Sequence, residues 1–472
     1  MTDVWKSAPM VSIAITGLVA LLVDSTKGER STAVYWLSLA GIAVAFGFSA
    51  NSLSTEVILF NGMILQGGYA SYFSMVFTVS AFFTVVLSRP YMQRIDREKG
   101  SLYILILFAT LGMMLMASAM DLIIVFLGIE LMSVCLYVLT GFMRTKATAN
   151  ESALKYFLLG AFATGFLLYG IALVYGVSGT TNLKLISESY PQLSENSLFL
   201  LGTGFLVIAF GFKVAAVPFH MWAPDVYEGA PTTITGFMST GAKAAAFAVF
   251  VTVFIRTFTI GGTPISEVLA LIAAASMILG NVTAIAQSNL KRMLAYSSIA
   301  HAGYMLSGIA AGNAEGETGV LFYLAAYTVM NIGAFGIISW VEQRDDTKLT
   351  FEDYAGFSAQ RPVLAALLSV FLFSLAGIPP FAGFFGKYYV FLAAVKADLL
   401  WLAVIGVLTS VVSVYYYLRL VMMMYFRDGK ATVEERIPGF ALAVIGAAAV
   451  LVILLGLYPS LIVDLTKGFF KI

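Results

Sequence analysis

The chain has very few charged side chains for its length. Of its 472 residues only 11% are Asp, Glu, Lys or Arg, whereas soluble domains carry roughly 25%. So few charges cannot cover the surface of a soluble globule of this size, and most of the outer surface must therefore face something other than water. Together with 60% apolar residues and a mean hydropathy of +0.90, this scarcity predicts a polytopic membrane protein.

Cysteine and histidine are almost absent as well. Cys135 is the only cysteine, and His220 and His301 are the only histidines. An iron–sulfur cluster needs several thiolates, and structural zinc normally needs four Cys or His ligands, so no metal or redox centre is predicted in this chain. The net charge of +1 argues against nucleic-acid binding, which requires a basic face. Redox chemistry linked to this protein is expected to run through another chain.

Long apolar runs, by contrast, fill most of the sequence. A helix that crosses the hydrocarbon layer needs about 20 apolar residues, and such runs predict an all-helical fold with fourteen membrane spans. The run from 102 to 142 is too long for one crossing and is divided at Asp121, while 51–67 is predicted to be a loop. The predicted spans cover residues 9–23, 33–49, 68–87, 102–120, 122–142, 153–177, 198–227, 232–255, 268–286, 293–311, 319–341, 363–395, 399–426 and 440–461.

Basic residues are distributed unequally between the two sets of loops. They accumulate on the cytoplasmic side of membrane proteins, and an even number of spans places both termini on one side. The loops of the opposite side hold sixteen Lys and Arg residues, and the terminal side holds six. Both termini are therefore predicted to lie on the outer side.

A few charges lie inside predicted spans, where each costs between ~3 and more than ~10 kcal/mol and is functional by default. Glu130 and Lys243 lie near the middle of their spans, and neither reaches an interface easily. A lysine removed from water holds its proton less tightly, and a nearby carboxylate restores the affinity. A series of such groups predicts a proton relay. The basic residues in spans are Lys155, Lys213, Lys243, Lys387 and Arg419.

Other interpretations of these charges stay open. Each is also compatible with a structural ion pair between helices or with an alternating-access transporter. Lys155 is read equally well as lying at the end of its span, because the predicted span begins at residue 153. Arg419 is read as reaching the lipid headgroups from the basic end of its span.

Two predicted spans are over-long and contain prolines, which remove a backbone donor and break helices. The first reads KVAAVPFH over residues 213–220, and the second reads AGIPPFAGFFGK over residues 376–387. Broken backbone at membrane depth persists only where protein or water satisfies it. The breaks lie five spans apart, so spans four to eight and nine to thirteen are predicted to form two five-helix units, the second inverted. Two simple packing kinks are the alternative.

The histidines allow two readings each. His220 follows the first break, and His301 lies in the predicted span 293–311. Either residue is able to relay a proton near neutral pH. A lone histidine within a membrane also often serves only as a hydrogen bond between helices.

Residues 218–233, PFHMWAPDVYEGAPTT, make the chain recognisable. The sequence resembles the antiporter-like membrane subunits of proton-pumping NADH–quinone oxidoreductase, respiratory complex I. The runs FMSTGAKAAAF (237–247) and LKRMLAYSSIAH (290–301) favour the subunit N type, which is called subunit 2 in mitochondria and chloroplasts, over its sister types L and M. The likeness covers essentially the whole chain.

The resemblance implies an all-α fold of about fourteen helices with two inverted five-helix repeats, in which helices seven and twelve are discontinuous. It divides the chain into helices 1–3 (residues 1–101), a first repeat of helices 4–8 (102–260), a second repeat of helices 9–13 (261–426) and helix 14 (427–472). The subunit L type also carries a long lateral helix after its last span, and this chain ends eleven residues after the last predicted span.

The resemblance also assigns roles to the charged residues. The proton-translocating residues of the family fall on Glu130, Lys213, Lys243 and Lys387, with Glu130 paired to Lys213 and Lys387 as the exit. The secondary relay positions fall on Lys155, His220 and His301. The sister types tend to have an acid where Lys387 stands, which again favours the N type.

By the same resemblance, the chain is a membrane-arm subunit of a translocase in a bacterial inner membrane, with both termini in the periplasm. FMN, iron–sulfur clusters, NADH and quinone are expected in partner subunits, and neither a cofactor nor a metal is expected here. Subunit M and small membrane subunits such as K are expected as neighbours, and the hydrophilic redox subunits as indirect partners.

Two rival functions remain open at this stage. A subunit of a multi-subunit cation/proton antiporter shares the broken helices and buried lysines, and works without NADH. A structural membrane scaffold uses its charges only to pin helices together.

Overall fold

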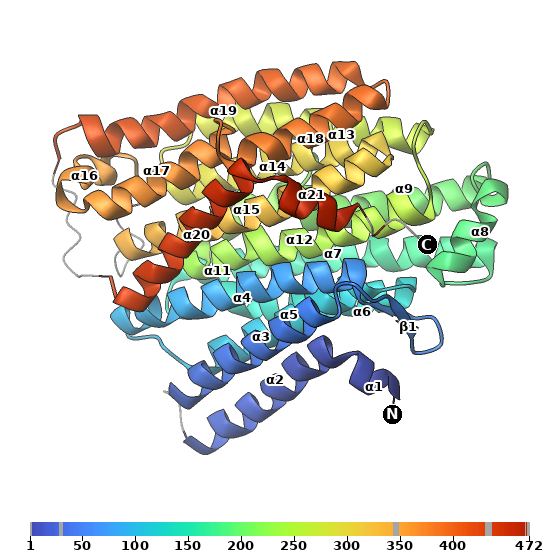
Figure 1. Ribbon diagram of the computed structural model, residues 1–472, viewed down its shortest axis with the longest axis horizontal. Helices are drawn as coiled ribbons and strands as arrows, with labels where there is room; N and C mark the ends of the chain where they lie inside the picture. Colours follow the sequence, from blue (N-terminus) through green and yellow to red (C-terminus); the bar gives the residue numbers. More distant parts are fainter. Residues whose placement is uncertain (1, 28–31, 343–348, 430–436, 468, 470–472) are drawn as a thin grey trace.

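The computed structural model describes residues 2–27, 32–342, 349–429, 437–467 and 469. Within these residues the chain is helical apart from one short antiparallel hairpin, and most of the long helices run side by side in one bundle (Figure 1). The coarse prediction of an all-helical polytopic membrane protein is thereby confirmed.

In chain order the elements are α1 (Thr2–Lys6), α2 (Ala8–Lys27), α3 (Thr32–Asn51), β1 (Val57–Leu59), β2 (Ile64–Gln66), α4 (Gly68–Arg94), α5 (Gly100–Ser118), α6 (Leu122–Thr140), α7 (Ala147–Ser178), α8 (Leu183–Leu193), α9 (Ser197–Val214), α10 (Trp222–Gly229), α11 (Thr232–Phe237), η1 (Met238–Ala242), α12 (Lys243–Phe250), η2 (Val251–Thr257), α13 (Pro264–Ile285), α14 (Leu290–Ala311), α15 (Ala314–Val341), η3 (Glu352–Tyr354), α16 (Phe357–Gln360), α17 (Pro362–Ala376), α18 (Ala382–Lys396), α19 (Leu400–Phe426), α20 (Gly439–Leu457) and α21 (Ser460–Thr466).

Twelve helical stretches in the described residues are long and apolar enough to cross a membrane. The predicted spans 293–311 and 363–395 are not among the twelve. The first falls on α14, whose serines, tyrosines and histidine lower its hydropathy, and the second is divided into the shorter helices α17 and α18. The stretch Thr232–Thr257 counts as one of the twelve, although the π-helical turns η1 and η2 interrupt its α-helical pattern.

The structure adds regular elements where only loops were predicted. Strands β1 and β2 form a hairpin in the segment 51–67, with Val57 opposite Gln66. Helix α8 lies between the sixth and seventh predicted spans, and its Asn182 N-cap accepts hydrogen bonds from two backbone amides. These elements are too short to cross a membrane, so a search for long apolar runs does not find them.

Side-chain caps fix several helix starts. Asp121 ends the apolar run at the predicted division and accepts a hydrogen bond of 2.8 Å from the Ile123 amide, which caps α6. Asn289 caps α14 and Asn313 caps α15 in the same way. Short polar side chains at these positions satisfy amides that would otherwise have no partner at a helix start.

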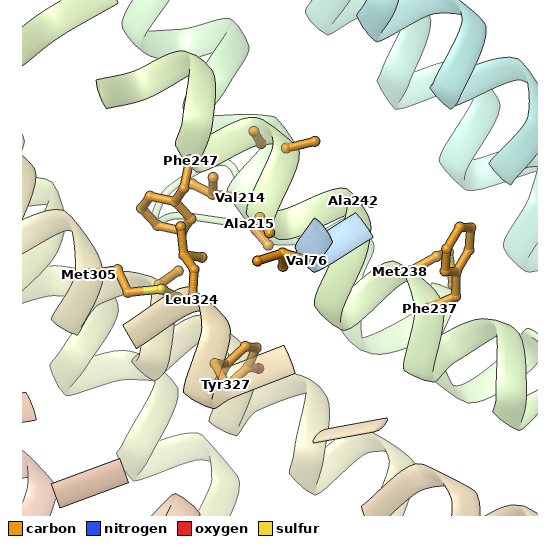
Figure 2. Packing of buried hydrophobic residues seen from close by; sticks show 14 of the residues in the cluster. Val76, Val214, Ala215, Phe237, Met238, Ala242, Phe247, Met305, Leu324 and Tyr327 are labelled. Carbon is orange, nitrogen blue, oxygen red and sulfur yellow. The ribbon is translucent and has the colours of Figure 1, made fainter. Parts of the chain in front are cut away.

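Most of the core is apolar, and Figure 2 shows some of its buried hydrophobic side chains. Glycines bring two helix pairs into close backbone contact: Gly112 of α5 faces Gly128 of α6, and Gly280 of α13 packs beside Ala300 of α14. An added Cβ on Gly280 would lie 2.6 Å from the Ala300 nitrogen. Small residues at such crossings are the usual means of close helix association in membranes.

Both ends of the described chain lie at the same end of the bundle, close to the β1–β2 hairpin and α8, whereas α16 lies at the opposite end (Figure 1). Six of the basic residues on which the predicted orientation depends lie outside the described residues, namely Arg30, Arg344, Lys348, Lys430, Arg436 and Lys471.

Candidate functional site

Lys213 lies on the last turn of α9 and reaches the neighbouring helix α6. The residue is 9% exposed, and its ammonium donates a hydrogen bond of 2.7 Å to the Ser133 hydroxyl. Glu130 lies one helical turn before Ser133 and accepts a hydrogen bond of 2.7 Å from Thr164 of α7. The hydrogen-bond partners of the two residues are thus hydroxyls, Ser133 for Lys213 and Thr164 for Glu130, and the described residues do not show the direct ion pair that the resemblance implied.

The chain leaves the helical conformation between α9 and α10, around Pro218. The exposed backbone groups of this break find partners in neighbouring side chains: the Val217 amide donates to the Ser276 hydroxyl at 2.9 Å, and the Trp222 indole donates to the Phe212 carbonyl at 3.0 Å. Such partners are what allows broken backbone at membrane depth. His220 lies half-buried in this break, and the structure does not place it among the hydrogen-bond partners of the buried lysines.

Lys243 begins α12 directly after the π-helical turn η1. The residue is 3% exposed, and its ammonium donates to both the carbonyl and the hydroxyl oxygen of Ser298, at 2.7 and 2.5 Å. The Tyr327 ring centroid lies 6.0 Å from the same ammonium. Single π-helical turns inside α-helices occur frequently at functional sites.

Helix α14 arranges the partners of this lysine. Ser297, Ser298, His301 and Tyr304 follow one another at helical spacing, and all four are buried. Residues three and four apart lie on the same face of a helix. One polar face of α14 therefore points into the bundle. A search of the sequence for apolar runs does not reveal this face.

His301 connects two tyrosine hydroxyls. Its Nδ1 lies 2.7 Å from the Tyr323 hydroxyl of α15, and its Nε2 lies 3.1 Å from the Tyr417 hydroxyl of α19. Tyr417 also shares a short hydrogen bond with Ser297. His301 thus lies inside a hydrogen-bonded cluster of three helices, as both readings of this residue require.

Lys387 lies on α18, just after the second break. The residue is 4% exposed, and its ammonium donates to the Ala376 carbonyl at the end of α17 (2.9 Å) and to the Ser410 hydroxyl of α19 (2.8 Å). The Tyr304 ring centroid lies 5.0 Å from this ammonium. A mostly apolar groove of about 660 Å³ between α18 and α19 is lined in part by Lys387 and Ser410.

The second half of the site forms a connected line. Lys243 binds Ser298, the adjacent Ser297 bonds with Tyr417, and Tyr417 contacts His301. The rings of His301 and Tyr304 pack edge to face with centroids 5.6 Å apart, and Lys387 lies over the Tyr304 ring. The structure therefore brings Lys243, His301 and Lys387 together along one face of α14.

Lys155 belongs to a different cluster. Its side chain is 42% exposed and forms ion pairs of 2.7 Å with both Glu151 and Asp225. Asp225 also binds Arg292, which in turn binds Glu228. Helix α7 begins at Ala147 rather than at residue 153, so Lys155 lies about two turns inside this helix, and the structure does not bring it to the buried lysines described above.

Two buried ion pairs were not singled out from the sequence. Near one end of the bundle, Arg256 donates to Glu317 at 2.6 Å and to the Phe469 carbonyl at 2.7 Å. Near the other end, Lys291 lies 3.9 Å from Glu342. All four charged residues stand next to the ends of apolar runs, where a charge normally reaches the headgroups, so only their burial marks them.

Within the described part of the chain no group of three or more His, Cys, Asp or Glu is arranged to hold a metal ion, and Cys135 is a buried free thiol. The chemistry that the site supports is proton transfer. Buried amines, hydroxyls and an imidazole are able to accept and pass on protons, and here hydrogen bonds and ring contacts bring them close together.

The chain is similar to several curated proteins over nearly its whole length. Residues 119–413 match the family described as NADH:quinone oxidoreductase/Mrp antiporter, TM. NADH-quinone oxidoreductase subunit N of Trichlorobacter lovleyi is 47% identical, with 98% of this chain and 96% of that protein aligned. Subunit N 1 of Chloroherpeton thalassium is also 47% identical, over 99% of this chain and 98% of that protein.

Solved structures agree with these sequence relatives. A chain of respiratory complex I from Thermus thermophilus with bound aureothin superposes with a TM-score of 0.85 at 36% identity, covering 98% of this chain and 100% of that one. A chain of the Mrp complex from Dietzia has a TM-score of 0.85 at 20% identity, covering 99% of this chain and 97% of that one, and this second likeness shows the fold alone.

Proposed function

The chain belongs to the NADH-quinone oxidoreductase subunit N family, and we propose that protons pass through it by way of Glu130, Lys213, Lys243 and Lys387. As a member of this family it is a membrane-arm, proton-translocating subunit of complex I.

One observation carries the proposal: the three lysines of the proposed path are buried and have neutral hydrogen-bond partners. Lys213, Lys243 and Lys387 bind hydroxyl and carbonyl oxygens, and none of them takes part in the ion pairs that the described residues form. A buried charge that only held helices together would be expected to have an opposite charge beside it. Lysines without one lose or gain a proton in response to small changes around them.

The proposed sequence of events begins on the side of the basic loops. Lys213 is loaded while Glu130 stabilises its charge, and movement of Glu130 then releases the proton towards Lys243. From Lys243 the proton passes along Ser298, Tyr417 and His301 to Lys387, which releases it on the opposite side. His301 serves as a relay on this path, whereas His220 and Lys155 are assigned supporting roles near the intake side.

A fold of fourteen spans with two inverted five-helix repeats is consistent with this path. Helix α14 and the pair α17–α18, added to the twelve long helices, give fourteen spans. The repeats 102–260 and 261–426, flanked by residues 1–101 and 427–472, place a broken helix at the same position in each unit. The glycine contacts between α5 and α6 and between α13 and α14, the first two helices of each unit, support this pairing.

Orientation and partners complete the proposal. We place both termini in the periplasm of a bacterial inner membrane, with the residues of the basic loops in the cytoplasm. NADH, FMN, iron–sulfur clusters and quinone are assigned to other subunits of the complex. Subunit M and small membrane subunits such as K are proposed as neighbours, with the hydrophilic redox subunits as indirect partners.

The direct test is Lys213→Ala in membrane vesicles that carry the assembled complex. We expect NADH-driven acidification of the vesicle interior to fall relative to the rate of NADH oxidation, because Lys213 is the first loaded group. Full acidification at the wild-type electron-transfer rate would show that Lys213 is not on the path. Lys243→Met separates a channel from a scaffold, because a scaffold tolerates a neutral side chain of similar length and keeps pumping.

A cation/proton antiporter without redox partners is distinguished by purification in mild detergent. Membership of the subunit N family predicts that the chain copurifies with hydrophilic subunits that contain FMN and iron–sulfur clusters. Copurification with cation-antiporter subunits alone would favour the rival function.

A further inference from the structure

Asn281 is a buried amide that the proposed path does not use. It lies on α13 and is 0% exposed. Its Nδ2 donates to the Tyr304 hydroxyl of α14 at 2.9 Å and to the Met277 carbonyl of its own helix at 2.7 Å. Its Oδ1 accepts a hydrogen bond of 3.0 Å from the Tyr416 hydroxyl of α19. One side chain therefore joins three helices.

The surroundings of this amide fix its orientation. The Met277 carbonyl is only an acceptor, so the NH₂ end of Asn281 has to face it. The oxygen end then faces Tyr416, whose hydroxyl has to be the donor. Both polar atoms of the amide thus have protein partners, and an amide is not among the side chains that titrate in proteins. Asn281 is therefore suited to holding its partners in place and not to carrying protons.

The backbones that carry Asn281 and Tyr304 are in direct contact, because each of the two residues follows a glycine. An added Cβ on Gly280 would lie 2.6 Å from a backbone nitrogen of α14, and one on Gly303 would lie 2.7 Å from a backbone oxygen of α13. Long helical side chains point towards the N-terminus of their helix, which directs the Tyr304 hydroxyl back to the level of Asn281. The hydrogen bond between them therefore starts from two tightly packed backbones.

The ring of Tyr304 presents its face to Lys387. The ammonium lies 5.0 Å from the ring centroid, a distance at which the negative face of an aromatic ring attracts a cation. The rings of His301 and Phe391 pack against the same ring at interplanar angles of 89° and 80°. The hydroxyl end of the ring is bound by Asn281. The position of the ring face beneath Lys387 therefore depends on this amide.

The oxygen end of the amide holds a neighbour of the proposed relay. Tyr416 packs its ring against that of Tyr417, with centroids 4.5 Å apart. The Tyr417 hydroxyl in turn contacts Ser297 and His301. Asn281 thus binds one tyrosine on each side of the path from His301 to Lys387, and its contact with the lysine runs through Tyr304 alone.

We propose that Asn281 is a positioning residue for the exit half of the path: through the Tyr304 hydroxyl it keeps an aromatic ring face beneath the Lys387 ammonium. This inference rests on the proposed role of Lys387. The ring face favours the charged form of the lysine, so an anchored ring gives Lys387 the same surroundings each time it receives a proton. A ring without its anchor changes its position, and the lysine is then protonated less often.

A purely structural amide is the competing explanation, because hydrogen bonds between helices also hold membrane proteins together. Asn281→Leu removes both ends of the amide at similar size and leaves two buried hydroxyls without this partner. Tyr304→Phe removes one hydroxyl and keeps the ring. The double variant removes both members of the pair, which costs less stability than leaving one of them unsatisfied. A structural role predicts that pumping recovers with stability in the double variant, whereas the positioning role predicts that it does not.

The measurement is the ratio of NADH-driven acidification to NADH oxidation in vesicles that contain the whole complex, with Lys387→Met as the reference. Thermal denaturation of the purified complex is measured alongside, and immunoblotting checks that each variant is incorporated. We expect Asn281→Leu, Tyr304→Phe and the double variant each to show at least half of the loss in Lys387→Met. The double variant is expected to be more stable than Asn281→Leu without a higher ratio.

Two tyrosine variants serve as controls. Tyr72→Phe removes a buried bond of 2.8 Å between α4 and the Leu321 carbonyl of α15, and it is expected to lower stability but not the ratio. Tyr416→Phe removes the other hydroxyl that binds Asn281. Because Lys387 contacts only the Tyr304 ring, the Tyr416→Phe variant should keep a higher ratio than Tyr304→Phe.

Each result has a defined consequence. A normal ratio in Lys387→Met overturns the proposed function, and this inference with it. A loss in Lys387→Met with a normal ratio in Asn281→Leu overturns the positioning role and leaves the proposed function intact. Recovery of the ratio in the double variant, or an equal loss in Tyr72→Phe, shows that the amide only stabilises the helices. A greater loss in Tyr416→Phe than in Tyr304→Phe overturns the route through Tyr304.

Discussion

At the scale of single residues, the protein keeps Lys213, Lys243 and Lys387 next to oxygen atoms without charge. Each of the three ammonium groups has one or two such partners at 2.5–2.9 Å. Neutral partners satisfy the charged form but attract it less than a carboxylate does. The balance between the charged and neutral forms of each lysine is therefore sensitive to small displacements, which is the property a proton relay requires.

Gly377 sets the position of Lys387. Its φ is +85°, and an added Cβ would lie 3.0 Å from Lys387 Cδ and 3.1 Å from Nζ. We expect Gly377→Ala to destabilise the protein by about 1 kcal/mol or more because of the positive φ, and to move the ammonium away from the Ala376 carbonyl. Acidification should fall more than NADH oxidation does.

Gly446→Ala is the matched control for this change. Gly446 lies in α20 and has no atom within 4 Å of an added Cβ, so thermal stability and acidification should both stay at the wild-type level. An equal loss in the two variants would contradict the role given to Gly377.

Tyr417 tests whether His301 is a relay. Tyr417→Phe removes the hydroxyl between Ser297 and His301, and two hydrogen bonds of about 1 kcal/mol each are lost. Tyr72→Phe removes a similar buried bond of 2.8 Å to the Leu321 carbonyl that lies off the proposed path. We expect both variants to lose stability in thermal denaturation but only Tyr417→Phe to lower the acidification ratio; similar ratios would leave His301 as a structural hydrogen bond.

At the scale of elements, charge in the middle of an apolar run was the most informative signal in the sequence. Lys213, Lys243 and Lys387 each lie inside a long, mostly apolar run, and the structure buries all three. Lys155 also lies in a predicted span, but its side chain is 42% exposed and pairs with Glu151 and Asp225 at 2.7 Å, so a position within an apolar run does not by itself report burial.

The two buried ion pairs, in contrast, are not predictable from the sequence. Arg256, Glu317, Lys291 and Glu342 stand at the ends of spans, where the same residues usually reach water. Their burial depends on segments that are distant in the chain, such as Phe469 against Arg256. The pattern of apolar and polar residues within one span carries no information about contacts with distant segments. A single sequence therefore does not reveal these pairs.

The packing of α13 against α14 depends on Gly280. A Cβ at this position would approach the Ala300 backbone nitrogen and the Tyr296 carbonyl at 2.6 and 2.8 Å, and backbone atoms do not yield as side-chain ends do. Gly280→Ala is therefore expected to force the helices apart and to destabilise the protein by about 1–3 kcal/mol. Thermal denaturation of the purified complex measures the loss.

Gly204→Ala in α9 is the comparison for this prediction, because no atom lies within 4 Å of the added Cβ. A stable Gly280→Ala variant with an unchanged acidification ratio would show that α14 tolerates displacement.

At the scale of the whole molecule, the bundle separates two kinds of polar structure. Its interior holds the line of lysines, hydroxyls and imidazole, while ion pairs without such links lie near its ends. The family fold was recognisable from motifs spread over the chain, whereas the hairpin, α8 and the contacts around His301 required the structure. Sequence motifs identify helices and their charges, but contacts between distant helices decide which charges meet.

Orientation in the membrane is testable because the chain has one cysteine, and that cysteine is buried. In a Cys135→Ala background, Lys184→Cys and Arg427→Cys place single thiols at exposed positions on opposite sides of the predicted membrane. A membrane-impermeant maleimide added to intact spheroplasts is expected to label Lys184→Cys only, and inverted vesicles should give the reverse pattern. Labelling of both thiols from one side would contradict the predicted number of crossings.

The polar face of α14 has a quantitative consequence. Because Ser298 binds Lys243 and Tyr304 lies beneath Lys387 on the same rigid helix, the two lysines do not behave as independent sites. A double-mutant cycle over Lys243→Met and Lys387→Met is therefore expected to show non-additive losses, with coupling of about 0.5–3 kcal/mol, as residues that share one network do. Protonation of one lysine is therefore expected to change the proton affinity of the other, and α14 is the element that couples the two sites.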